Sequence, residues 1–190
     1  MRNVLPGVML TYFRTLAHAN RLANHRLHAA CAKLTDANFQ ATRTGFFPSL
    51  HATLNHILTV DWYYLAALHG ETNQRKAFAV RHPFEDLRSL AAAQLVADKR
   101  LLAWCAAASE TTLETRVALE RANGVEDEHL GYMLLHLFTH QIHHRGQAHA
   151  MLSGTSIKPP QLDDFIMQSD APFRADDLQA VAWTEADLYR

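Results

Sequence analysis

The chain has 190 residues, of which 48% are hydrophobic and 19% charged, and its formal net charge is −1. This composition excludes a disordered chain and predicts a single domain over residues 1–190. The chain has neither the basic excess of a nucleic-acid binder nor the roughly 20-residue apolar run of a membrane span. Two widely separated cysteines and an N-terminus without a clean signal-peptide pattern favour a cytoplasmic protein.

The first two predicted helices cover residues 8–34 and 48–69, where apolar residues recur at helical spacing. Ser49 is a start signal for the second helix, because the preceding proline prevents further helix on its N-terminal side. His69-Gly70 closes that helix. The connection at residues 36–47 is polar and is expected to be irregular.

Polar residues on these helices allow more than one interpretation. His25 and His28 are three residues apart and could reach a common metal, but their polar neighbours favour a solvated face. His56 lies in mid-helix on a face of small residues, which leaves room for a ligand. Asp61 falls on the face of the helix that carries the leucines. Its carboxylate either lies in water at the edge of the bundle or is buried and needs a partner. The candidate partners are Arg145, Asn20 and Asn24.

A third helix is predicted over residues 84–108, after a polar connection at residues 70–83. Residues 109–128 differ, because the sequence there has a two-residue period and Asn123-Gly124 is a turn dipeptide. We therefore expect a short extended segment that crosses the bundle. Four long helices with two long connections predict an all-α four-helix bundle, and a simple up-down-up-down order is not required.

The fourth predicted helix, residues 129–152, carries five of the thirteen histidines within fourteen residues. On a helical projection His136, His140, His143, His144 and Gln147 fall on one stripe. His140 and His144 are four residues apart, so their rings stand one above the other and can bind one divalent metal. A third ligand must come from another helix, and His56 is the best candidate, followed by His51.

The other side of this helix is apolar as well, with Leu135, Phe138, Ile142 and Leu152, so a second subunit, the C-terminal tail or both should cover it. The tail at residues 153–190 contains too many large apolar residues to stay free and is expected to dock. Within it, LDDFIM and DDLQAVAW each predict a short helical turn.

Two stretches, LNHILTVDWYYLAAL and FTHQIHHRGQAHAML, resemble the DinB/YfiT-like metalloenzyme family. LANHRLHAACAKLT and the run from Pro159 to Asp163 are similar to it too, so the resemblance covers nearly the whole chain. It implies an up-down-down-up four-helix bundle, usually dimeric, with a divalent metal held by His56, His140 and His144. His143 and Arg145 also match the family motif, without a ligand role being implied.

Family members of assigned activity include transferases that use low-molecular-weight thiols, so the resemblance favours a thiol S-transferase. A metal-dependent hydrolase and a non-catalytic metal-binding or small-molecule-binding stress protein are the alternatives. Three imidazoles suit zinc or nickel best here, with iron or copper as further options. We expect no nucleic acid or membrane partner. The residues expected to surround the metal and its ligands are His136, His143, Gln147, Tyr63, Asp61 and Arg145.

Overall fold

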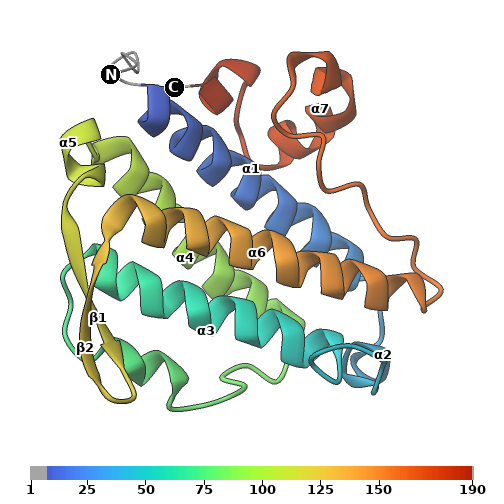
Figure 1. Ribbon diagram of the computed structural model, residues 1–190. Helices are drawn as coiled ribbons and strands as arrows, with labels where there is room; N and C mark the ends of the chain where they lie inside the picture. Colours follow the sequence, from blue (N-terminus) through green and yellow to red (C-terminus); the bar gives the residue numbers. More distant parts are fainter. Residues whose placement is uncertain (1–7, 190) are drawn as a thin grey trace.

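The computed structural model describes residues 8–189 and is mostly helical (Figure 1). The ends of its four long helices lie within three residues of the predicted ends. These helices are α1 (Val8–Cys31), α3 (Leu50–Leu68), α4 (Leu87–Ala107) and α6 (Leu130–Ser153).

Side-chain caps set where these helices begin. The hydroxyl of Ser49 accepts a hydrogen bond from the backbone N–H of Ala52, as the sequence predicted. The start predicted at residue 84 is wrong, because Asp86 caps α4 through the N–H of Ser89. Phe84 stays outside that helix, since its N–H donates to Asn55 Oδ1 at 3.0 Å and its carbonyl accepts from the same amide at 2.9 Å.

Each long helix packs against two others: α1 and α3 both contact α4 and α6. Helix α3 is the most enclosed, because every residue in it except His56 and Trp62 is buried. At His56, where burial is interrupted, this helix faces the group of histidines on α6. The main apolar core between the helices includes Leu54, Leu58, Leu65, Leu90, Leu101, Leu134 and Leu137.

The connections contain more regular structure than predicted. The short helix α2 (Asp36–Gln40) interrupts the first connection, and a 3-10 turn, η1 (Gln74–Phe78), lies in the second. The expected extended segment is a β-hairpin that follows α5 (Glu110–Leu113), with antiparallel strands β1 (Arg116–Arg121) and β2 (Gly124–His129). Glycine suits the start of β2 because φ at Gly124 is +134°.

The C-terminal tail docks on α1, which confirms the expectation. Its elements are η2 (Gln168–Asp170), α7 (Ala171–Ala180) and η3 (Glu185–Tyr189), drawn in red tones in Figure 1. Phe165, Leu178 and Leu188 form a second apolar cluster with residues of α1. The guanidinium of Arg26 lies 4.3 Å from the centroid of the Phe165 ring and 2.6 Å from an oxygen of Asp164.

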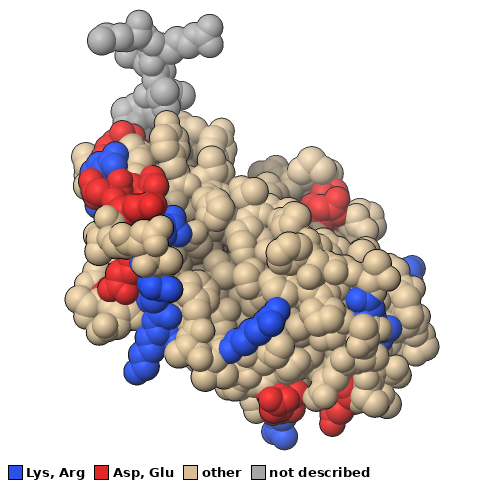
Figure 2. Space-filling view, turned by 60° about the horizontal axis from the view of Figure 1, so that its bottom comes forward, with Lys and Arg blue, Asp and Glu red and all other residues tan. Residues whose placement is uncertain are grey.

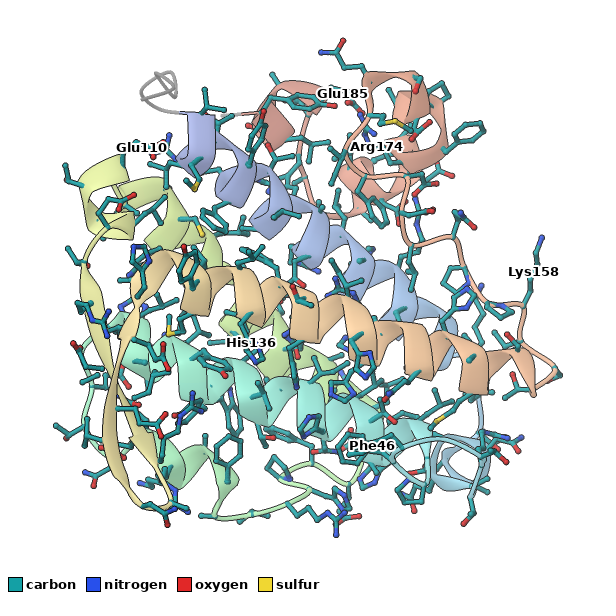
Figure 3. The ribbon with its side chains drawn as sticks, in the orientation of Figure 1. Phe46, Glu110, His136, Lys158, Arg174 and Glu185 are labelled. Atoms are coloured by element: carbon teal, nitrogen blue, oxygen red, sulfur yellow. The ribbon has the colours of Figure 1, made fainter. Side chains whose placement is uncertain are left out.

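Only one of the two predicted tail turns forms. DDLQAVAW contributes to the end of α7, but LDDFIM contains no helix. Arg174, which lies near Glu185 in Figure 3, donates to the carbonyl of Asp164 at 3.0 Å and to that of Met167 at 2.8 Å. This buried guanidinium takes the place of the backbone N–H groups that would bond those carbonyls in a helix, which explains why LDDFIM is irregular.

The apolar outer side of α6 is covered only in part. Phe138 and Leu152 are buried, as expected, but Leu135 is 51% exposed and Ile142 is 58% exposed. Within residues 8–189 the tail therefore does not cover this face completely, because it docks mainly on α1. Cover by a second subunit stays a prediction.

Charged side chains are scattered over the face shown in Figure 2, and most of its surface is uncharged. Strands β1 and β2 pair two arginines with acids, Arg116 with Asp127 and Arg121 with Glu126. Within the described range, no helix has both the length and the apolar character needed to cross a membrane.

Arg26 should be the residue on which tail docking depends most. Arg26→Ala leaves the carboxylates of Asp164 and Asp177, which are only 13% and 15% exposed, without their cation. We expect a loss of about 2 kcal/mol in the free energy of unfolding, measured by urea denaturation. The control is Arg100→Ala, whose pair with Glu71 is more exposed and should contribute less than about 1 kcal/mol. Equal losses in both variants would contradict the docking argument.

Candidate metal centre

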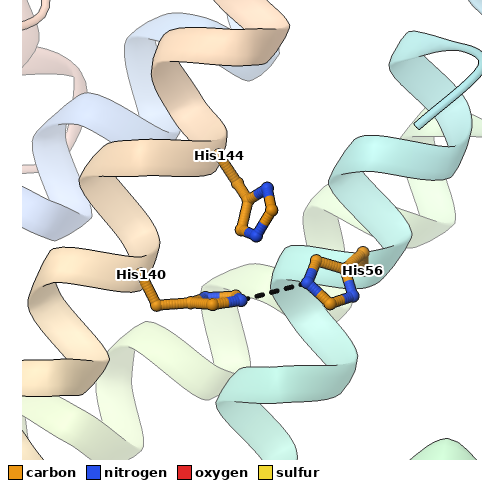
Figure 4. A group of neighbouring side chains, drawn as sticks. All are labelled: His56, His140 and His144. Atoms are coloured by element: carbon orange, nitrogen blue, oxygen red, sulfur yellow. Dashed lines mark hydrogen bonds between the residues drawn. The ribbon is translucent and has the colours of Figure 1, made fainter. Parts of the chain in front are cut away.

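Three histidines from two helices converge on one point (Figure 4). His56 projects from α3, and His140 and His144 project from successive turns of α6. Their ring centroids lie 4.4 to 5.0 Å apart, and one nitrogen of each ring lies within 4.8 Å of the others. In the part of the chain that the structure describes, no other group of three metal-binding side chains converges in this way.

The spacing of the nitrogens fits a metal ion. His56 Nε2 and His140 Nε2 are 3.0 Å apart. Metal–nitrogen bonds of roughly 2.0–2.1 Å in a tetrahedral site place two ligand nitrogens roughly 3.3 Å apart. A small movement of the rings is therefore enough to bring these two side chains to ligand distance. Three imidazoles leave one position of a tetrahedral ion for another molecule.

The environment keeps the three rings neutral, which is the form that binds metal. Burial, reinforced by His144 and Arg81, lowers the pKa of His56 to about 4. Burial and the neighbouring His144 and His56 lower the pKa of His140 to about 3. Burial also lowers the pKa of His144, against the opposing effect of the hydrogen bond that its ring donates to Gln147. Each neutral ring therefore carries a nitrogen lone pair near neutral pH, and His56 and His140 share a hydrogen bond through Nε2.

A side-chain amide orients one of the three rings. His144 Nδ1 lies 2.8 Å from Gln147 Oε1, and Gln147 Nε2 lies 2.9 Å from His143 Nε2. The amide oxygen accepts the Nδ1 proton, which leaves Nε2 of His144 as the lone-pair nitrogen. Gln147 and His143 thus lie beside the centre, as their positions on the helix predicted. Nδ1 of His140, by contrast, is buried without a hydrogen-bond partner among the described residues.

Two aromatic residues form an apolar wall that the sequence reasoning missed. The ring of Phe47 lies 4.3 Å from that of His56 and 5.5 Å from that of His144. Phe46 lies 6.3 Å from His144, is 77% exposed, and is seen beside the start of α3 in Figure 3. The sequence does contain a signal for this wall, because two aromatic residues lie between a glycine and a proline directly before the helix that carries His56.

Three other candidates lie outside the convergent group. His136, labelled in Figure 3, is exposed, and its ring centroid is 6.4 Å from that of His140. Tyr63 is turned to the hairpin, where its hydroxyl donates to the carbonyl of Glu120 at 2.9 Å. His51, the second choice for the third ligand, is bonded through Nε2 to the carbonyl of Phe84 at 2.8 Å. Tyr63 and His51 are thus each hydrogen-bonded away from the histidine group.

Asp61 and Arg145 belong to the core rather than to the histidine group. Asp61 is 3% exposed, so the alternative that it lies in water is wrong. Its carboxylate accepts hydrogen bonds from the amides of Gln94, at 2.6 Å, and Gln141. The expected partners of Asp61 bond to one another instead, since Arg145 donates to the amide oxygens of Asn20 and Asn24.

Burial shifts both of these charged groups toward neutrality. It raises the pKa of Asp61 well above its usual range, with Gln94 opposing the shift and Asp98 adding to it. It lowers the pKa of Arg145 to about 10, although Asp98 and Asp61 oppose the shift. At neutral pH the guanidinium stays charged, and the Asp61 carboxyl is a poor general base because it is enclosed and bonded.

A family model described as "DinB family" matches residues 9–174. The matched segment contains both helices that carry the three histidines and ends within α7. No curated protein matches the chain.

Replacing any one of the three converging histidines should release metal. In His56→Ala, His140→Ala or His144→Ala, the affinity for the metal should fall by more than roughly 10–100-fold, which is the cost of losing a residue that only hydrogen-bonds to a ligand. Metal per chain after dialysis, measured by mass spectrometry, checks this. His143→Ala is the control on the same helix and should keep most of its metal. Wild-type metal content in His56→Ala would rule out His56 as a ligand.

His56 and His140 should each cost the metal-free protein stability as the pH falls from 7 to 5, while the raised pKa of Asp98 acts in the opposite direction. Unfolded histidine titrates near ~6.5, whereas the folded pKa values of His56 and His140 are about 4 and about 3. Between these values the unfolded chain binds more protons, so acid favours unfolding. His140 should contribute up to about 1 kcal/mol, allowing for its partial exposure.

Urea unfolding with a chelator at both pH values, in the wild type and in His140→Gln, measures this contribution. The variant should lose less stability than the wild type on acidification. An identical loss in the two proteins would show that His140 is not held neutral by the fold.

Proposed function

The chain belongs to the DinB family, and we propose that it is a metal-dependent enzyme that transfers a low-molecular-weight thiol to an electrophilic substrate at the His56–His140–His144 centre. The observation that carries the proposal is the convergence of three neutral imidazoles beside an aromatic wall. A bound divalent ion would hold a thiol as its reactive thiolate. Zinc or nickel is the proposed ion, with iron and copper as alternatives.

The surrounding side chains support a thiol with an anionic group and a substrate with an apolar part. Phe47 offers apolar contact directly beside the histidines, and the exposed ring of Phe46 extends this apolar surface toward solvent. Arg81 lies close enough to His56 to contribute to the lowering of its pKa, after burial and His144. Its exposed guanidinium can attract a carboxylate on the thiol, as many low-molecular-weight thiols carry one.

The two alternative functions have weaker support. Hydrolysis calls for a general base near the ion, but no carboxylate belongs to the convergent group within residues 8–189, and His143 is already bonded to Gln147. A purely structural metal would be closed by four protein ligands, whereas this group supplies three. The thiol transferase therefore fits the donor set best.

We also propose the up-down-down-up bundle order and a homodimer. In Figure 1, α1 and α6 run from left to right and α3 and α4 run back, which supports that order. Tyr132, Leu135 and Ile142 leave an exposed apolar stripe along α6, which a second copy of the chain would bury. Two free, buried cysteines, Cys31 and Cys105, are consistent with a cytoplasmic location.

Thiol binding at the centre can be observed with cobalt(II) as the probe metal. Adding a low-molecular-weight thiol to the cobalt-loaded protein should produce a sulfur-to-cobalt charge-transfer absorption. The same protein loaded with zinc or nickel should then accelerate conjugation of the thiol to a chlorinated nitrobenzene. Both signals should disappear in His140→Ala, which loses a ligand, and persist in His69→Ala, whose histidine is exposed at the end of α3.

The outcomes separate the candidate functions. Charge-transfer absorption together with conjugation supports the transferase. Hydrolysis of an activated ester without any thiol effect would favour the hydrolase and overturn the proposal. Metal binding with neither activity across a panel of thiols would leave the non-catalytic binding protein as the better description.

A further inference from the structure

A cavity of about 670 Å³ lies between α1 and α4, the two long helices that do not carry the converging histidines. Its apolar part is formed by Ala91, Ala92 and Leu95 of α4, together with Leu34 and Phe39. Its volume is within the range of sites that hold small organic molecules. None of the residues that line it belongs to the metal centre or to the aromatic wall.

One wall of the cavity carries three polar side chains of α1 in a row. Arg21, His25 and His28 occupy positions i, i+4 and i+7 and therefore share a face of the helix. Each is half-buried, which corrects the expectation that His25 and His28 lie on a solvated face. Across residues 8–189 the structure gives these three side chains no hydrogen bond and no ion pair.

The polar wall is suited to an anion. The Arg21 guanidinium is charged at neutral pH, and the acid that acts on it, Asp98, is already bonded to Asn24 and Gln94 in the core. Burial, with the nearby charges of Arg21 and Arg145, lowers the pKa of His28 to about 3. His28 is thus neutral and offers one N–H donor without adding charge. One fixed cation and adjacent donors match a single carboxylate.

The other end of the cavity disfavours a second anionic group. Asp36 and Asp86 line it together with Arg88, so its formal charge is negative. Cys31, where α1 ends, lies about 15 Å along the helix axis from Arg21, at roughly 1.5 Å per residue. A metal ion does not fit the row, because His25, His28 and Asp36 do not converge as the three histidines of the metal centre do.

We propose that this cavity binds a small organic monoanion, with its carboxylate against Arg21, His25 and His28 and its apolar chain along Ala91, Ala92 and Leu95. This site is separate from the proposed metal centre and does not depend on it. The ligand class follows from one cation at one end, apolar walls between the ends, and acids at the far end.

Calorimetric titration with octanoate tests the proposal. Octanoate should bind at least about tenfold more tightly than octanol, since a charge-assisted contact contributes about 1.5–3 kcal/mol. Suberate, which has a second carboxylate, should bind more weakly than octanoate. Arg21→Gln should abolish the preference for octanoate over octanol, and Arg75→Gln, an exposed arginine of η1, should keep it.

A second variant covers the case in which Arg21→Gln folds poorly. Ala92→Phe adds a ring at an exposed position of the apolar wall and should block both ligands without changing the melting temperature much. Both variants should retain wild-type metal content. The proposal is overturned if octanoate gives no heat, if Arg21→Gln keeps the preference, or if octanoate binding is lost in His140→Ala but not in Ala92→Phe.

Discussion

A closed ring of buried polar side chains joins the four long helices, and the geometry of the rest of the molecule depends on it. Asp61 accepts from Gln94 and Gln141, and Gln141 accepts from Arg145. Two asparagines accept from Arg145 and donate to Asp98, and the ring closes because the Gln94 amide also donates to Asp98, at 3.1 Å. All its members are at most 6% exposed. Breaking it would leave buried groups unpaired, at about 1–3 kcal/mol each, so one relative arrangement of the helices is strongly favoured.

The ring also determines where the three converging histidines point. Gln141 and Arg145 each follow a converging histidine by one residue on α6. One residue is about 100° around a helix, so when these two side chains face the core, His140 and His144 are directed to the side, toward α3. Asp61 holds α3 in the matching orientation, in which His56 is one of two positions that are not buried. A one-residue slip of α6 would remove both the ring and the histidine cluster.

The sequence predicted what depends on local spacing. Helical periodicity gave the long helices, the i, i+4 pair gave His140 and His144, and the small-residue face pointed to His56. Gln94 and Phe47 were missed because their roles come from contacts with Asp61 and His144, which lie far from them in the chain. The exposed state of Leu135 could not be predicted either, since periodicity shows that a face is apolar and does not show what packs against it.

The ring finally limits which residues are available for chemistry. Asp61 and Arg145 look like an acid and a cation poised beside the histidines, yet both are enclosed and bonded to the core. Their role is therefore to hold the helices, and the catalysis proposed at the centre rests on the imidazoles, the ion they would bind and the aromatic wall. Because the ring uses the polar groups of α1 that face inward, Arg21, which follows Asn20 directly, is left unpaired at the α1–α4 cavity. The same helical offset that directs the histidines of α6 toward α3 thus places Arg21 of α1 at the wall of this cavity.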